Sequence, residues 1–246
     1  MIKFFRRIRQ NLLMENKTGK YFKYAIGEIV LVVIGILIAL SINNWNERKK
    51  LVKVQIDILK GISNDLTNDT IEINSNIRHL ENIVHTDSLL INHLIEQKTQ
   101  SENLSNWIIT TANSGTTLNL HTSFYNEAKV KGLAIIKNRI LRAHIGKLYE
   151  FDYNHILDLE TTNPLFQFSI ILRSKLYQFI SLNRDGAFIS NSDYSQLIMD
   201  KKLHYELSNI LTRRGNMLRY RYIPLIEEVN ETLELISKEI ESLEKK

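Results

Sequence analysis

Four arginines and two tyrosines lie within ten residues, between Arg213 and Tyr222. A guanidinium pairs with a carboxylate or phosphate through two parallel hydrogen bonds, and a tyrosine ring adds a stacking surface. The cluster therefore predicts a small-anion site with these candidate residues: Arg213, Arg214, Arg219, Tyr220 and Arg221. The alternative is that the arginines pair with acidic residues on neighbouring helices. It is favoured because acids are plentiful and no glycine-rich anion nest adjoins the cluster. A second basic set is open to the same two interpretations: Lys137, Arg139, Arg142 and Lys147.

The seven histidines show no spacing that would place two of them on one metal ion. The sequence contains no His-x-x-x-His, Glu-x-x-His or HExxH arrangement. His144 and His155 share one face of a predicted helix, but eleven residues of helix separate them by about 16 Å. Serine-hydrolase, phosphate-loop and kinase motifs are absent as well. We therefore expect no catalytic, cofactor-binding or metal-binding residue.

Residues 183–186, with Asn191 and Asp193 downstream, are weakly similar to a calcium-binding loop. Their spacing lacks the alternating oxygen ligands and the final glutamate of an EF-hand, so a turn between two helices is favoured. The chain has no cysteine, which excludes disulfides and cysteine-ligated metals.

Helices must position these residues, because the 246 residues include only 2 Pro and 9 Gly and show no convincing strand-like alternation. A long helix is predicted beyond the membrane segment, with apolar residues at seven-residue spacing: Val52, Leu59, Leu66, Ile73, Leu80 and Leu94. Further apolar residues make this stripe wider than a coiled-coil seam, so it faces several helices. Asp69, Asn76 and Asp87 interrupt it, and such polar residues set the packing register or face a small wet gap.

Shorter helices are predicted over residues 102–113, 124–130, 133–160 and 165–182. Gly132 should close the second of these, and Pro164 should start the last. Another helix should begin at a cap, Ser192 or Asp193, and run towards Arg214. Gly215 is expected to break it, and Pro224 to kink or restart the final helix, which ends at residue 246. The predicted fold class is all-α, a single N-terminal transmembrane helix that continues into a periplasmic multi-helix bundle.

Residues 24–42, YAIGEIVLVVIGILIALSI, are apolar enough to cross a bilayer, and nineteen helical residues extend about 28 Å. Glu28 near one end can reach the lipid headgroups or contact a partner within the membrane, and Trp45 marks the opposite interface. A small-residue pattern, Gly27, Gly35 and Ala39, permits close helix packing and thus a homodimer. A cleaved signal peptide is disfavoured, because the preceding basic region of about 24 residues is too long for one.

The net charge of +5 comes entirely from the N-terminal end of the chain. Residues 1–42 hold 7 of the 32 basic and 2 of the 27 acidic residues, so 25 of each remain. The basic stub, residues 1–23, starts as an amphipathic helix and suits anionic lipid headgroups. Its charge favours an N-terminus in the cytoplasm and a domain, residues 43–246, on the far side. That neutral domain argues against nucleic-acid binding.

The N-terminal blocks MIKFFRRIRQNLL and GKYFKYAIGEIVLVVIGILIALSINNWNE carry a family resemblance. They are similar to the opening of uncharacterised membrane-anchored proteins of Bacteroidetes, which share Gly27-Glu28 at the membrane entry and residues 43–46, Asn-Asn-Trp-Asn, at the exit. A looser similarity runs from residues 123–125 through Gly132 to Tyr149. The resemblance implies an inner-membrane location and a periplasmic helical domain. It carries no assigned activity.

Three functions remain open from the sequence. The first, which we favour, is a non-enzymatic interaction or scaffold protein of the cell envelope whose protein partners are unknown. The second is an extracytoplasmic sensor that binds a small anion near residues 213–222 and signals along the long helix to a separate cytoplasmic partner. The third is an enzyme with clustered carboxylates in a pocket, which sequence alone does not display.

Overall fold

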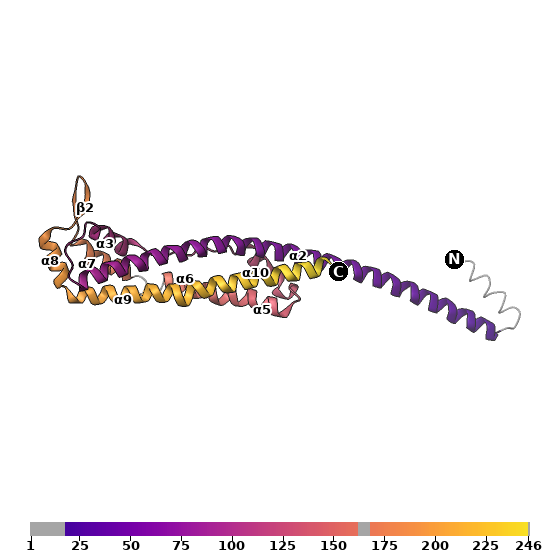
Figure 1. The fold of residues 1–246 in the computed structure, drawn as a ribbon. Helices are drawn as coiled ribbons and strands as arrows, with labels where there is room; N and C mark the ends of the chain where they lie inside the picture. The colour runs from indigo at the N-terminus through magenta and orange to yellow at the C-terminus, as the bar shows by residue number, and fades with distance from the viewer. Residues whose placement is uncertain (1–17, 162–167, 246) are drawn as a thin grey trace. The chain divides into compact units, whose positions relative to one another are not determined.

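The computed structural model describes residues 18–161 and 168–245, and they are predominantly helical (Figure 1). The chain divides into two compact units, Met1–Val54 and Gln55–Lys246. The longest helix, α2 (Thr18–Ile95), contains the boundary between them. The all-α prediction is confirmed except for one short hairpin. The predicted amphipathic start of the stub and the helix start at Pro164 lie outside the described residues.

The first unit consists of the N-terminal part of α2, and its apolar side chains are exposed. Of the described residues, α2 supplies the one helix long and apolar enough to cross a membrane, and none of that apolar window is buried. Trp45 is 53% exposed, and the Lys49 ammonium lies 3.9 Å from the centre of its ring. Gly27 and Gly35 face open space, so a helix–helix contact through them stays a prediction. This part of the chain can therefore anchor the protein in a bilayer.

The second unit continues with helices and two short strands. In chain order these are α3 (Leu104–Asn113), α4 (Ser123–Lys131), the 3₁₀ turn η1 (Leu133–Ile135), α5 (Arg139–Lys147), the π-turn η2 (Leu148–Asp152), α6 (Tyr153–Thr161), α7 (Phe168–Tyr177), β1 (Ser181–Asn183), β2 (Gly186–Phe188), α8 (Asn191–Met199), α9 (Lys201–Met217), the π-turn η3 (Leu218–Tyr222) and α10 (Ile223–Glu244).

The α9–η3–α10 rod runs antiparallel to the C-terminal part of α2 (Figure 1). Gln55 near the start of this part of α2 bonds Glu239, whereas Asp87 near its end pairs with Arg214. Helices α5 and α6 also run antiparallel to α10, since Asn138 bonds Glu239 and Lys147 bonds Glu228. The wide apolar stripe of α2 thus packs against several helices, as predicted. At the far end, α3, α7, α8 and α9 enclose an apolar core with the end of α2.

Several predicted boundaries are wrong. Residues 133–160 are not one helix, because η1 ends at Ile135 and Asn138, in an extended conformation, caps a new helix, α5. Gly132, with a positive φ of 85°, follows the end of α4 as predicted. The cap of α8 is Ser190, which accepts a hydrogen bond from the Asp193 N–H, rather than Ser192 or Asp193. That helix ends at Met199, and Asp200 caps a new one, α9.

The predicted break at Gly215 is wrong, since this residue lies inside α9. The predicted restart at Pro224 agrees with the structure, in which α10 begins at Ile223 and has Pro224 in its first turn. Between them the chain passes through the π-turn η3 without leaving the helical path. Sequence reasoning treated these residues as breakers because glycine and proline disfavour helix interiors on average.

The expectation of no sheet is wrong for six residues. β1 and β2 pair antiparallel with Ser181 opposite Phe188 and Asn183 opposite Gly186. The predicted turn at residues 183–186 is confirmed as the hairpin turn, where Gly186 takes a φ of 126° that favours glycine. Leu182, expected at the end of a helix, instead lies on β1 and is 80% exposed.

Candidate ligand-binding cleft

A cleft of about 190 Å³ opens on the second unit where α5 and α6 lie against α10. We call it the π-turn cleft, because both π-turns contribute to its wall. η2 supplies Phe151 and Asp152, and η3 supplies Tyr220 and Arg221. The remaining lining residues come from α5, α6 and α10: Lys147, His155, Ile156, Pro224, Leu225 and Glu228. π-Turns recur at functional sites because they displace side chains from the regular helical register.

The cationic side chains of the cleft differ in how they are paired. Lys147 donates from Nζ to Asp152 Oδ2 at 2.7 Å and to Glu228 Oε2 at 3.0 Å. Partial burial opposes the charge on Lys147, but these two hydrogen bonds outweigh it and raise the pKa of the ammonium. Arg221 is exposed, and among the described residues it makes no hydrogen bond or ion pair. Its guanidinium is therefore not occupied by any group of residues 18–161 and 168–245 and can pair with a ligand.

Aromatic side chains border the same opening. Phe151 and His155 stack with their ring centres 6.1 Å apart and their planes 6° apart. Phe151 is 64% exposed and Tyr220 is 60% exposed, so both rings offer a face to solvent. A guanidinium beside flat apolar faces can hold a small anion that also carries a planar or apolar part.

The structure separates the residues of the predicted anion cluster. Tyr220 and Arg221 line the π-turn cleft together with Lys147 from the second basic set. Arg213, Arg214 and Arg219 do not line it. Whether the cluster binds an anion stays a prediction.

Arg214 has the structural pairing that was the favoured alternative. Its Nη1 donates to both carboxylate oxygens of Asp87 at 3.0 and 2.9 Å, and its Nη2 donates to the carbonyls of Thr111 and Ser114. The side chains of Arg214 and Asp87 are only 10% and 1% exposed. Burial raises the pKa of Asp87, and the neighbouring Arg214 charge opposes that rise. This pair lies in the interior of the second unit and is closed to a ligand.

Next to the cleft, His144 and two carboxylates from α10 converge. His144 Nδ1 lies 3.2 Å from Glu228 Oε1. One ligand atom from each of His144, Glu228 and Glu231 falls within 4.8 Å of the other two. Sequence analysis predicted no metal site here, because His144 and Glu228 are 84 residues apart and lie on different helices. The only local signal was the pair of glutamates at an i, i+3 spacing, which share a helix face.

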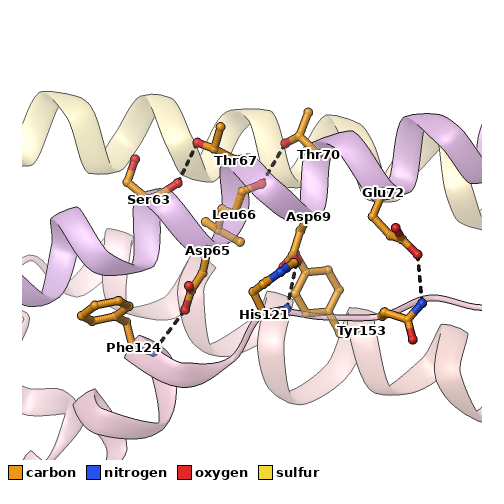
Figure 2. Close-up of polar contacts among 11 residues, drawn as sticks. Ser63, Asp65, Leu66, Thr67, Asp69, Thr70, Glu72, His121, Phe124 and Tyr153 are labelled. Carbon is orange, nitrogen blue, oxygen red and sulfur yellow. Dashed lines mark hydrogen bonds and ion pairs between the residues drawn. The ribbon is translucent and has the colours of Figure 1, made fainter.

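A second polar cluster ties a loop to α2 around the fully buried Asp69 (Figure 2). Asp69 Oδ1 accepts a hydrogen bond from the backbone N–H of His121 at 2.9 Å. The same oxygen lies 2.8 Å from Nδ1 of the His121 ring. Asp69 Oδ2 accepts a hydrogen bond from the Tyr153 hydroxyl at 2.9 Å. Burial raises the pKa of Asp69, and these hydrogen bonds oppose the rise.

Neighbouring contacts extend this attachment along α2. Asp65 accepts a hydrogen bond from the Phe124 N–H at 3.1 Å, and Asn119 donates to Glu72 at 3.1 Å (Figure 2). The Asp69 cluster therefore fixes residues 119–124 against α2. Sequence analysis found Asp69 as a polar interruption of the stripe but not His121 or Tyr153, which approach it from distant parts of the chain.

The comparisons with known proteins place the chain in a family but give it no activity. One family model, DUF6090, described as a family of unknown function, matches residues 28–203. No curated protein and no solved structure matches the chain. The matched stretch includes most of the apolar segment, the Asp69 cluster and Lys147, and it ends before η3 and α10. Because it covers well over half of the sequence, the chain belongs to DUF6090, a family of unknown function.

Proposed function

We propose that this protein is a single-pass protein of the inner membrane whose helical domain lies outside the cytoplasm and acts by binding protein partners rather than by catalysis. The observation that carries the proposal is the apolar window of α2, none of which is buried. Such a surface needs a lipid environment, and the basic stub before it favours the cytoplasmic side for the N-terminus. The stub would then face anionic lipid headgroups.

The second unit offers an apolar surface for a partner at its hairpin end. A cleft of about 280 Å³ there is lined by Ile109, Tyr177, Ile180, Leu182 and Ala187. Exposed apolar residues gathered around a hollow are typical of surfaces that another protein covers. We assign this hairpin cleft to the protein partner.

Topology can be tested cleanly, because the natural chain has no cysteine. Lys17→Cys places a thiol in the basic stub, and Lys245→Cys places one at the exposed end of α10. A maleimide that cannot cross the inner membrane should label the Lys245→Cys protein in intact cells. It should label the Lys17→Cys protein only after the membrane is permeabilised. The reverse pattern, or cleavage that separates the two sites, would refute the proposed anchoring.

Partner binding can be tested by crosslinking the full-length protein in native membranes and quantifying the proteins that co-purify with it. Leu182→Asp puts a charge into the hairpin cleft, whereas Val130→Asp makes the same change at a 90% exposed residue on α4. The Leu182→Asp variant should lose a partner that both wild type and Val130→Asp retain. Equal recovery from all three would exclude the hairpin cleft as the contact surface.

The π-turn cleft favours a second candidate function, the sensing of a small anion. Arg221 lies there beside exposed aromatic rings without an ion-pair partner among the described residues. Phosphate and benzoate are suitable probes, since one tests charge alone and the other adds a planar apolar part. Arg221→Gln should weaken their binding to the full-length protein, and Arg219→Gln, an equivalent change at an exposed residue outside the cleft, should not. Equal binding by both variants would remove this candidate.

A further inference from the structure

We propose that His144, Glu228 and Glu231 bind one divalent transition-metal ion, for which Zn²⁺ is the best chemical match. Neither the family nor the sequence motifs assign this site. It consists of one imidazole nitrogen from α5 and two carboxylates from successive turns of α10. Accessible zinc sites typically have three protein ligands and leave a further position for water or another ligand, and both imidazole nitrogen and carboxylate oxygen bind zinc.

The geometry is already close to that of a bound ion. Ligand atoms around a tetrahedral zinc ion stand about 3.3 Å apart, given metal–ligand bonds of roughly 2.0–2.1 Å. His144 Nδ1 and Glu228 Oε1 are 3.2 Å apart, so both can reach one ion with little movement. The ligand atom of Glu231 lies within 4.8 Å of the other two, so it must approach by at most about 1.5 Å, and its exposed side chain can do so by a change of rotamer.

Partial burial and their mutual contact restrict two of the three ligands. The His144 and Glu228 side chains are 26% and 18% exposed, and they are held where α5 packs against α10. A ligand pair fixed by packing loses little side-chain entropy when it binds an ion. The exposed Glu231 then closes the site from the solvent side.

Lys147 is compatible with a metal on this site and would hold Glu228 in place. Its Nζ bonds Glu228 Oε2, the oxygen that does not face His144. A metal would therefore take Oε1 while Lys147 keeps Oε2, an arrangement in which an outer hydrogen bond orients a ligating carboxylate. Asp152, the second partner of Lys147, offsets the positive charge of the lysine. The repulsion between this charge and a nearby metal ion is therefore reduced.

The donor set selects among metals. Imidazole nitrogen favours zinc, copper, nickel or iron over calcium and magnesium, which prefer all-oxygen sites. Calcium would also require several more oxygen ligands than the two carboxylates supply. Glu228 also lines the π-turn cleft, whereas His144 and Glu231 do not, so the metal site adjoins that cleft through one ligand.

The test is zinc binding by the untagged full-length protein in detergent, stripped with a chelator and titrated calorimetrically with zinc chloride. Wild type should bind one equivalent of zinc with micromolar or tighter affinity. Glu231→Gln and His144→Gln should each weaken binding on the order of tenfold or more. The matched controls are Glu227→Gln, an exposed glutamate on the same helix, and His85→Gln, an exposed histidine on α2. Both should bind zinc like wild type.

A second readout reports on the ligands directly. Replacement of zinc by Co²⁺ should give a visible absorption band whose intensity indicates four- or five-fold coordination, and this band should change in Glu231→Gln but not in Glu227→Gln. Circular dichroism should confirm that each variant is folded. Absence of zinc binding by wild type at 100 micromolar zinc, or unchanged affinity in both Glu231→Gln and His144→Gln, would overturn the proposal.

Discussion

Replacing Arg214 by methionine should strongly destabilise the second unit. The substitution keeps an unbranched apolar side chain but removes the guanidinium that pairs with Asp87. Asp87 is 1% exposed and would keep only the hydroxyl of Thr111, at 2.8 Å, as a hydrogen-bond donor. Breaking a buried pair by removing one partner typically lowers the free energy of unfolding by about 3–5 kcal/mol.

The magnitude follows from burial rather than from the number of charges nearby. Screening by solvent is small at Arg214, and its Nη2 also satisfies two carbonyl groups that would lose their donor. Arg221→Met is the matched control, because the same atoms are removed from an exposed arginine without a described partner. We expect that control to change the free energy of unfolding by less than about 0.5 kcal/mol.

The effect should depend on pH in a defined direction. Burial raises the pKa of Asp87 above its unfolded value even with Arg214 present. For such a group the folded state binds the extra proton, so the contribution to stability is largest below the unfolded pKa and is lost as pH rises through the folded pKa. Without Arg214 the folded pKa rises further. The difference in the free energy of unfolding between wild type and Arg214→Met should therefore become smaller as the pH falls from neutral into the acidic range.

The assay is urea unfolding of the full-length protein in detergent, followed by far-UV circular dichroism at neutral and acidic pH. Combining Arg214→Met with Asp87→Leu should recover much of the lost stability, because no buried charge is then left alone. The reasoning fails if Arg214→Met is no more destabilising than Arg221→Met. It also fails if the destabilisation is the same at all pH values and is not relieved by Asp87→Leu.

Three further predictions concern stability and use the same unfolding assay. Tyr153→Phe removes a hydrogen bond to buried Asp69 and should lower the free energy of unfolding by about 1.5–3 kcal/mol. Its control, Tyr149→Phe, removes a buried hydroxyl that has no partner among the described residues and should cause no loss of stability. Gly61→Ala would place a Cβ against the Phe124 ring and should destabilise the protein by about 1–3 kcal/mol. At Gly146, which lies in a helix, an added Cβ would meet open space, so Gly146→Ala should stabilise the protein. Ser190→Ala removes the cap of α8 and should lower the free energy of unfolding by about 0.5–2 kcal/mol, measured against Ser195→Ala on the exposed side of the same helix. In each pair the first variant should be less stable than the second. The opposite result would contradict the contact on which that prediction rests.

Much of the fold follows from periodicity that the sequence displays directly. The seven-residue series on α2 continues through residue 87, where an aspartate replaces the expected apolar residue. That single departure marked a polar contact in the core, and Arg214 provides it. Asp69 was found in the same way. In both cases the sequence predicted a residue that sets the packing register or faces a small wet gap, and the structure shows a buried polar contact whose partner the sequence did not identify.

The hairpin and the metal-ligand cluster could not be found in this way. β1 and β2 are three residues each, too short for alternation of apolar and polar residues to be distinguished from chance. His144 and Glu228 approach because α5 packs antiparallel to α10, and this pairing depends on loops whose lengths carry no simple rule. Sites built between helices need the packing to be known first.

The arginine cluster was predicted as one site, but Arg214 pairs with Asp87 in the interior whereas Arg221 lines the π-turn cleft. The π-turn η3 explains this separation. Arg214 and Arg221 are seven residues apart, close to two full turns of a regular α-helix, so they should share a face. The buried positions of α9 recur every three or four residues: Leu203, Leu207, Ile210, Arg214 and Met217. The next buried residue is Tyr222, five positions later, and the regular intervals then resume on α10.

This one extra residue rotates everything after it by roughly 100°, the angle between successive residues of a helix. Tyr222 therefore takes the buried place that a regular helix would give to Arg221, and Arg221 moves to the rim of the π-turn cleft. At η2 the buried residues are Leu148 and Tyr149, followed by Tyr153 on α6, and Phe151 between them is exposed beside the cleft. The two π-turns thus bring Phe151 and Arg221 to the wall of one cleft, while buried residues continue on both sides of each turn.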